Sequence, residues 1–330
     1  MIKQPSVTAG VVRDALESMP HAGSRTLARF LHKEHPKLFP TVDKARQVIR
    51  YYRGTSGKDN LKGRRGDIVP RLAALEMPES VAEKRPFFDV AGPAQVLVMS
   101  DIHFPYHDKG ALEAAVMYAV KRKPDIVYLN GDTVENYGVS RWEPDPRKRD
   151  VARELKLSRQ GLEFLRNKFP KARLIFKHGN HEDRWESFMI KNAPAVLGVE
   201  DFLLSRLLRF DSLGIEEVGS RQVATLGKLM LVHGHEMPKG MNNPVNPARG
   251  LFLRMNETSM CGHFHQTSQH SDSSGIRKNL VSCWSTGSLC DLSPDYAICN
   301  RWNHGFAWVS IERGGEFNVD NLKIIHGKVY

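Results

Sequence analysis

Five short segments between residues 101 and 265 carry side chains that bind metal ions. They are Asp101-Ile102-His103, Gly131-Asp132, Gly179-Asn180-His181-Glu182, His233-Gly234-His235 and Gly262-His263-Phe264-His265. One such segment alone would indicate little, because a lone histidine is more often a core or surface residue than a metal ligand. The five segments in this order predict a metal centre.

The types of ligand indicate both the metal and the reaction. Imidazole, carboxylate and amide groups without thiolate suit Mn²⁺, Fe or Zn²⁺. Two ions about 3.5 to 4 Å apart can share a carboxylate, lower the pKa of a bridging water and clamp a phosphoryl group for in-line attack. The predicted reaction is hydrolysis at phosphorus.

The five segments match the pattern DxH, GDxx(D/E), GNH(D/E), H and GHxH, so the chain resembles the calcineurin-like metallophosphoesterase superfamily over about residues 95–325. The resemblance implies two divalent metal ions, with Mn²⁺ as the first choice and Fe or Zn²⁺ as alternatives. It assigns Asp101, His103 and His265 to one ion, Asn180, His233 and His263 to the other, and Asp132 to a bridging position. The stretch from Trp284 to Gly305 resembles phage-encoded members.

The same resemblance suggests catalytic and substrate-binding side chains. His181 is in the position of the family's catalytic histidine, which contacts the phosphoryl group and can protonate the leaving oxygen. Glu135 is in the place of an acid that orients this histidine; the alternative is a solvated loop acid. His107, His235 and Arg184 are candidate substrate contacts, although His107 could be a surface histidine and His235 could support a neighbouring ligand.

One departure from the protein phosphatase branch bears on the substrate. Those enzymes read GDxVDRG, with an arginine that grips the phosphate, whereas Asn136 occupies the arginine position here. This argues against phosphoserine and phosphothreonine substrates. The insert at 136–150, with Trp142 and basic residues 147–149, could wall the site and supply stacking and phosphate contacts, or it could be a solvated loop.

The elements that position these residues alternate between strand and helix. Strands are expected at 95–99, 125–129 and 173–176, and helices at 111–121 and 153–167. Metal segments follow the ends of these strands, where open α/β sheets place their ligands. Further strands are expected at 222–224, 229–232, 260–261, 280–283, 306–311 and 317–325, with a hairpin turn at Gly314-Gly315. The predicted fold class is α/β, a metallophosphoesterase sandwich of two sheets flanked by helices.

Residues 1–53 are expected to form a small all-α domain of three helices. The first runs from Val7 to Met19, Ser24 caps a second that reaches about Leu31, and Thr41 caps a third that reaches Arg53. A basic last helix resembles a helix-turn-helix domain, although the connection at 33–41 is longer than in the tight motif. Candidate nucleic-acid contacts on the third helix are Lys44, Arg46, Arg50 and Arg53. Arg46, Arg50 and Arg53 are spaced to project from one side. The alternative is a helical docking domain with solvated arginines.

Charge and composition indicate the partners and the location of the protein. Residues 1–70 hold 14 Lys or Arg and 6 Asp or Glu, a net charge of +8, and residues 71–330 hold 34 and 31, a net charge of +3. Concentrated basic charge favours DNA as a partner. The absence of a long apolar run and of a secretory signal predicts a soluble, cytoplasmic protein without membrane contact. Four cysteines lack CxxC spacing and receive no role.

Three functions fit these observations. The leading hypothesis is a dimetal phosphodiesterase that hydrolyses DNA, with a metal-binding domain at 93–330, a linker and lead-in at 54–92, and the basic domain at 1–53. The first alternative is a phosphomonoesterase acting on nucleotides, nucleic acid ends or another small phosphate ester. The second is a DNA-binding regulator with a residual phosphoesterase scaffold, which the complete set of predicted ligands argues against.

Overall fold

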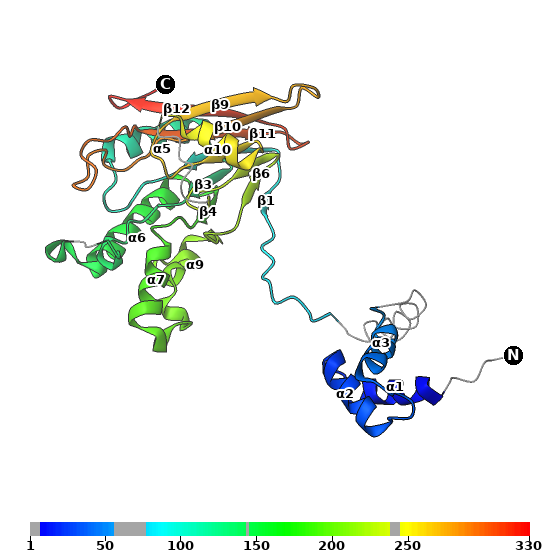
Figure 1. The fold of residues 1–330 in the computed structure, drawn as a ribbon. Helices are drawn as coiled ribbons and strands as arrows, with labels where there is room; N and C mark the ends of the chain where they lie inside the picture. Colours follow the sequence, from blue (N-terminus) through cyan, green and yellow to red (C-terminus); the bar gives the residue numbers. More distant parts are fainter. Residues whose placement is uncertain (1–6, 56–76, 143–144, 238–244) are drawn as a thin grey trace. The chain divides into compact units, whose positions relative to one another are not determined.

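The computed structural model describes residues 7–55, 77–142, 145–237 and 245–330, and the chain divides into two compact units, Met1–Glu83 and Lys84–Tyr330 (Figure 1). Each unit has a buried core of its own. Of the predicted linker and lead-in at 54–92, residues 56–76 lie outside the described residues. The same stretch contains strand β1, Phe88–Val90, which pairs with the second sheet of the larger unit.

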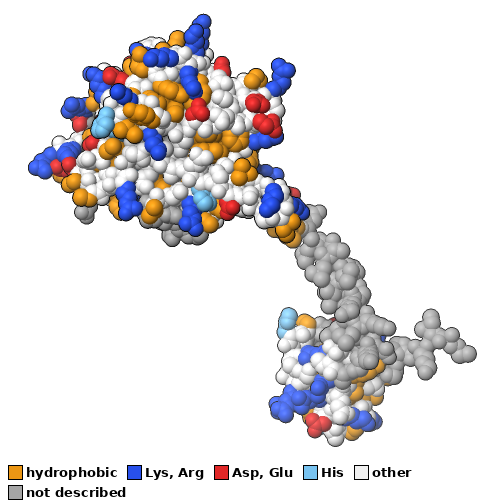
Figure 2. All heavy atoms as spheres, turned by 90° about the horizontal axis from the view of Figure 1, so that it is seen from above, with side chains coloured by type: hydrophobic (Ala, Val, Ile, Leu, Met, Phe, Trp, Pro, Cys, Tyr) orange, Lys and Arg blue, Asp and Glu red, His pale blue; other side chains and the backbone are white. Residues whose placement is uncertain are grey.

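The smaller unit consists of α1 (Val7–Ser18), α2 (Ser24–Glu34) and α3 (Val42–Tyr52), in agreement with the three predicted helices. Thr41 caps α3 as predicted, because its side chain accepts a hydrogen bond of 3.2 Å from the backbone N of Lys44. The predicted cap at Ser24 is wrong: Ser24 is the first residue of α2, and Gly23 precedes it without a side-chain cap. Figure 2 shows Lys and Arg side chains on the visible face of this unit.

The long connection between α2 and α3 has a packing reason. Phe39 lies within it and is fully buried against Leu31 and Ile49 in the core of the unit. His32 Nδ1 lies 2.7 Å from the carbonyl oxygen of Phe39, which ties the connection to α2. The connection therefore contributes a core side chain that a three- or four-residue turn would not supply.

The first sheet of the larger unit has the strand order β13-β12-β11-β2-β3-β4-β5. Its strands are β2 (Ala94–Met99), β3 (Ile126–Asn130), β4 (Arg173–Lys177), β5 (Ile215–Val218), β11 (Gly305–Ile311), β12 (Phe317–Ile325) and β13 (Lys328–Val329). Strands β2 to β5 are parallel, and β11 is antiparallel to both β2 and β12. The predicted hairpin turn lies between β11 and β12, where Gly315 has a φ of 84°.

The second sheet has the order β1-β6-β7-β8-β10-β9. Besides β1, its strands are β6 (Ala224–Leu226), β7 (Leu229–Leu231), β8 (Ser259–Cys261), β9 (Ser268–Ser273) and β10 (Leu280–Ser285). Beside it lies α10 (Pro247–Met255), whose Ala248 and Leu251 pack on Cys261 and Cys283. The larger unit also contains α7 (Asp183–Asn192), α8 (Leu204–Leu207) and α9 (Phe210–Leu213). Short 3₁₀ turns lie at Tyr137–Val139, Pro146–Lys148, Pro194–Val196 and Glu200–Phe202.

The two sheets pack face to face, as predicted. Val96 and Val98 of β2 share a core with Leu231 and Met260 of the second sheet. The alternate residues of β2, such as Leu97, pack instead with the helices α5 (Lys109–Arg122) and α6 (Val151–Lys168). Because both faces of β2 are covered, its sequence is apolar apart from the partly buried Gln95. Among the described residues, no helix combines the length and the apolar character needed to span a membrane.

Candidate metal centre

The metal-binding segments follow strands of both sheets. Asp101 and His103 come after β2, Asp132 after β3, and Asn180 and His181 after β4. His233 comes after β7, and His263 and His265 after β8. Because β2, β3 and β4 are parallel, their carboxyl ends lie at one edge of the first sheet. Contacts between the segments bring the two sets of side chains together.

One group of side chains centres on His265. Its Nε2 atom lies 3.1 Å from Asp101 Oδ1 and 3.4 Å from His103 Nε2. All three residues are buried. This group contains the three residues that the resemblance assigned to one metal ion.

A second group centres on Asp132 and includes His233, whose Nε2 lies 3.1 Å from Asp132 Oδ2. Asp132, His233 and His263 each present a ligand atom within 4.8 Å of the others, and Asp132 forms a similar group with His103 and His181. Asp132 therefore lies between the two groups, where a bridging carboxylate is needed. A carboxylate so placed can serve two ions at once.

Two buried polar atoms support metal binding independently of the motifs. Asn180 Oδ1 and His233 Nε2 are buried without a hydrogen-bond partner in the part of the chain that the structure describes. Buried polar atoms are nearly always hydrogen-bonded, so the unpartnered amide oxygen of Asn180 calls for a ligand. His233 Nε2 does so too, because it faces the Asp132 carboxylate at 3.1 Å without hydrogen-bond geometry. Both atoms are ordinary donors to divalent cations. The residues present therefore fit a dimetal centre.

The backbone of the centre is held in a conformation that L-amino acids rarely adopt. Positive φ angles occur at Asp101 (55°), His103 (55°), Asp132 (51°), His263 (67°) and His265 (55°). Left-handed conformations cost a side-chain-bearing residue roughly 1 kcal/mol or more, and such residues cluster at functional sites. Five of the seven predicted ligands share this feature. Their backbone therefore departs from the extended conformation of the preceding strands.

Buried carboxylates control the charges of the histidines. Burial lowers the pKa of His103, but the Glu135 carboxylate outweighs burial and raises that pKa to about 9. Burial also lowers the pKa of His233, but the Asp132 carboxylate outweighs burial and raises that pKa to about 10. For His263, burial and the nearby charge of His233 act together and lower the pKa to about 4. Glu135 and Asp132 thus favour the protonated forms of His103 and His233.

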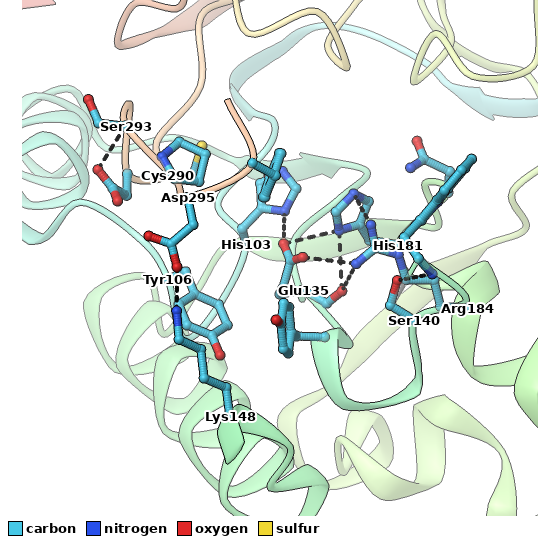
Figure 3. A pocket seen from close by; sticks show the side chains of 16 residues that line it. His103, Tyr106, Glu135, Ser140, Lys148, His181, Arg184, Cys290, Ser293 and Asp295 are labelled. Carbon is cyan, nitrogen blue, oxygen red and sulfur yellow. Dashed lines mark hydrogen bonds and ion pairs between the residues drawn. The ribbon is translucent and has the colours of Figure 1, made fainter. Parts of the chain in front are cut away.

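Glu135 links the metal site to the predicted catalytic histidine (Figure 3). Its Oε2 atom lies 2.6 Å from His103 Nδ1 and 3.1 Å from His181 Nδ1. Its Oε1 atom accepts a 2.8 Å hydrogen bond from Arg184 Nη1. Arg184 Nη2 in turn lies 2.8 Å from His181 Nε2. Glu135 is therefore a buried anchor, rather than the solvated loop acid of the alternative interpretation.

A cavity of about 760 Å³ lies beside these groups and is lined by His103, Glu135, Asn180, His181 and Arg184 among others. His107 and His235, the other two predicted substrate contacts, are not among its lining residues. His235 faces acids instead, with Nε2 3.7 Å from Asp183 Oδ2. Asn136 donates a 3.0 Å hydrogen bond to the carbonyl oxygen of His181, so it supports the loop that carries that histidine.

The predicted nucleic-acid contacts on α3 differ in exposure. Lys44 and Arg50 are exposed, whereas Arg46 is partly buried. Arg53 does not project with the other arginines, because its guanidinium donates to Ser24 Oγ (2.9 Å) and to the carbonyl oxygen of Ala22. It ties the end of α3 to the start of α2.

Sequence reasoning missed the residues that support the ligand loops. The Glu182 carboxylate is buried and accepts hydrogen bonds of 2.7 to 3.1 Å from the backbone N atoms of Asp132, Thr133, Val134 and Gly179. Glu236 accepts from the backbone N of His233 and is paired with Lys177, whose Nζ lies 2.9 Å from Glu236 Oε1. Glu182 is visible in the GNHE segment, but no sequence pattern distinguishes Lys177.

Cys290 was also missed. It is buried, lines the cavity and places Sγ 3.8 Å from His265 Nδ1. It presents a ligand atom within 4.8 Å of those of His103 and His265. The cysteines received no role from the sequence, whereas the thiol of Cys290 lies beside two of the predicted ligands. No CxxC spacing signals this residue, which lies 25 positions beyond His265.

Known proteins resemble the larger unit. The family model described as calcineurin-like phosphoesterase matches residues 94–277. The Gene 54 protein of Mycobacterium phage L5 is 26% identical over an alignment of 249 positions, and the match covers 68% of this chain and 96% of that protein. The Gene 54 protein of Mycobacterium phage D29 is 25% identical over 251 residues, with the same coverage. Both relatives are phage proteins, as the stretch after Trp284 suggested.

Among solved structures, the wild-type Vps29 of Entamoeba histolytica in complex with Zn²⁺ is 13% identical, with a TM-score of 0.38. The match covers 72% of this chain and 96% of that one. This likeness is too slight to bear on substrate or mechanism.

Proposed function

We propose a function from one premise: the chain belongs to the calcineurin-like phosphoesterase family. It is a metal-dependent hydrolase of phosphoesters, and its clustered His and Asp side chains are candidate ligands for the family's dimetal centre. We infer that its substrate is DNA and that it cleaves phosphodiester bonds. Mn²⁺ is the metal that we propose for both positions.

The concentration of positive charge in the smaller unit is the observation that carries the choice of DNA. Residues 1–70 have a net charge of +8, against +3 for the remaining 260 residues. Lys44 and Arg50 are exposed on α3, the helix that a helix-turn-helix-like unit would present to DNA. Lys and Arg side chains that neutralise phosphates supply most of the affinity of non-specific binding. The smaller unit would therefore hold the substrate.

The residues beside the metal ligands suit leaving-group chemistry. When bound, two divalent ions supply an activated water and a clamp on the phosphoryl oxygens. His181 has its Nδ1 atom held by Glu135, so its Nε2 atom is the one available to protonate a leaving oxygen. Arg184 now occupies that Nε2 atom. A phosphate oxygen that engaged the guanidinium would free Nε2 to take up a proton from solvent, and the imidazolium would then give that proton to the leaving oxygen.

The decisive experiment is Mn²⁺-dependent hydrolysis of end-labelled DNA, beside p-nitrophenyl phosphate and bis(p-nitrophenyl) phosphate. The full chain is compared with residues 84–330, a unit with its own cores. We expect both proteins to cleave the small diester and the truncated one to lose most DNA cleavage. Asp132→Asn is the inactive control, which should lose bound metal while its circular dichroism spectrum stays unchanged.

Two outcomes would overturn the proposal. Hydrolysis of the monoester alone, indifferent to truncation, would make the protein a phosphomonoesterase. DNA binding without cleavage of any of the three substrates would favour a DNA-binding regulator. Equal DNA cleavage by the two proteins would leave a nuclease but remove the substrate-holding role of the smaller unit.

A further inference from the structure

The cavity beside the metal centre has an aromatic wall that phosphoryl chemistry does not require. Tyr106, Tyr137, Trp142 and Tyr296 line it, and they come from the loop after β2, the insert at 136–150 and the segment after Cys290. Three of them are exposed to solvent, with exposed fractions of 44% for Tyr106, 69% for Trp142 and 67% for Tyr296. The rings of Tyr106 and Tyr137 lie 6.1 Å apart, centroid to centroid. Large aromatic side chains left open inside a cavity offer faces for a planar ligand.

The catalytic groups form another part of the same wall. Glu135, His181 and Arg184 line the cavity together with the tyrosines, and Figure 3 shows Tyr106 and Lys148 apart from His181 and Arg184 within it. Lys148 of the insert forms an ion pair with Asp295 of the segment after Cys290. This pair connects the two segments that supply Trp142 and Tyr296. The volume of about 760 Å³ falls within the range of small-ligand sites, roughly 300 to 1,000 Å³.

The side chains that line the cavity indicate which class of ligand it can bind. A phosphoester that reacts at His181 and also meets tyrosine and tryptophan faces must carry a flat ring system close to its phosphate. Ser140, Asp291 and Ser293 also line the cavity and offer hydroxyl and carboxylate groups to the polar edge of such a ring. A nucleoside has all of these features, because its base combines a π face with donor and acceptor edges. A sugar phosphate or an alkyl phosphate has no flat aromatic ring that could stack on the tyrosine and tryptophan side chains.

We propose that this cavity is a nucleoside subsite, which holds one unpaired base next to the phosphate that is cleaved. The inference rests on the proposed function and narrows its substrate to single-stranded DNA or unpaired ends. A base stacked and paired within a duplex cannot enter a walled cavity without leaving its helix.

The test uses two diesters with the same leaving group, thymidine 5′-(p-nitrophenyl phosphate) and methyl p-nitrophenyl phosphate, with the full-length protein and Mn²⁺. We expect kcat/KM to be at least about tenfold higher for the thymidine diester, from the usual contribution of base stacking. Tyr296→Ala and Tyr106→Ala should each reduce this ratio severalfold. Tyr330→Ala is the matched control, because Tyr330 is 65% exposed and does not line the cavity.

A binding measurement without turnover complements the kinetics. Trp142 lines the cavity, so thymidine 5′-monophosphate should quench tryptophan fluorescence in the wild-type chain, and Trp142→Phe should remove the quenching. A ratio near one in the wild type, or a ratio that Tyr296→Ala and Tyr106→Ala both leave unchanged, would overturn the subsite.

The two proposals fail in different ways. Preference for the thymidine diester without cleavage of single-stranded or duplex oligonucleotides would remove the nuclease and retain the nucleoside subsite. Equal cleavage of single-stranded and duplex DNA, unaffected by Tyr296→Ala, would retain the nuclease and remove the subsite.

Discussion

At the scale of single residues, one carboxylate connects a predicted metal ligand to the predicted acid. Glu135 contacts the Nδ1 atoms of both His103 and His181, so a metal ligand and the candidate acid are oriented by the same side chain. Each imidazole is thereby turned to present its Nε2 atom to the centre. Carboxylate partners of this kind fix the tautomer and ring orientation of ligand histidines. The position of the acid relative to the metals is thus built in before substrate arrives.

The role of His181 predicts a dependence on the leaving group. We expect His181→Ala to lower kcat by about 10²- to 10⁴-fold for DNA and other substrates with alkoxide leaving groups, because these need a proton. The loss should be much smaller for p-nitrophenyl esters, whose leaving group is stable as an anion. Metal content, measured by mass spectrometry, should stay unchanged because the seven predicted ligands remain.

A matched control for this prediction is His326→Ala, which removes an exposed histidine from the turn before β13. It should leave every rate unchanged. Equal losses across all leaving groups in His181→Ala would contradict the acid role and point to substrate positioning instead.

The predicted ligands were found in the sequence because each lies in a short contiguous segment with fixed spacing. Cys290 and Tyr296 could not be found in this way, since they lie between β10 and β11, outside every predicted metal-binding segment. Lys177 is hidden for another reason: its partner Glu236 lies 59 positions away, and only the fold makes the two adjacent.

At the scale of elements, the strand ends need support because several ligand loops leave the strands with positive φ angles. Glu182 gives this support by accepting hydrogen bonds from four backbone N–H groups in the loops that follow β3 and β4. It holds the loop of the bridging carboxylate against the loop of Asn180. Without it, four buried donors would lose their acceptor.

Replacing this carboxylate should therefore weaken both the fold and the metal site. We expect Glu182→Gln to lower the free energy of unfolding by about 2 to 4 kcal/mol, because an amide group brings N–H donors against backbone N–H donors. Metal affinity should fall by roughly 10- to 100-fold, as for other residues that orient ligands. Urea denaturation and metal titration measure the two effects.

Glu186→Gln provides the control, since Glu186 lies four residues further along the chain, in α7, and is exposed. It should change the free energy of unfolding by less than about 0.5 kcal/mol. Unchanged stability and metal affinity in Glu182→Gln would contradict the supporting role.

Burial decided which elements the sequence could predict. Strands β2, β3 and β11 are covered on both faces, so their apolar runs stand out. Strand β9, with the sequence Ser-Gln-His-Ser-Asp-Ser, is mostly exposed at the edge of its sheet and was missed. Its pairing with β10 depends on backbone hydrogen bonds, which leave no hydrophobic period in the sequence. Strand β5 has the same character, with two exposed glutamates.

At the scale of the whole molecule, the concentrated positive charge lies in the smaller unit and the predicted metal ligands lie in the larger one. The core of the smaller unit is made of residues 11–52, and the cores of the larger unit are made of residues from 88 onward. Each unit therefore buries its own apolar side chains. This separation allows the proposed DNA-holding role of the smaller unit to be tested without disturbing the predicted metal centre.

The last prediction concerns how salt weakens DNA binding. A plot of log K against log salt concentration has a slope of about −0.9 for each phosphate that the protein neutralises. If Lys44 and Arg50 contact phosphates, Lys44→Ala and Arg50→Ala should each reduce the magnitude of that slope by about 1, and the double variant by about 2. Fluorescence anisotropy of a labelled oligonucleotide, with Asp132→Asn to prevent cleavage, measures the slope.

Lys191→Ala is the control, because Lys191 is exposed on α7 of the larger unit. It should leave the slope unchanged while making the same change in net charge. A slope that responds equally to Lys44→Ala and Lys191→Ala would mean that binding follows overall charge and that α3 has no privileged contact with DNA. A slope that responds to neither would place the phosphate contacts on other basic residues.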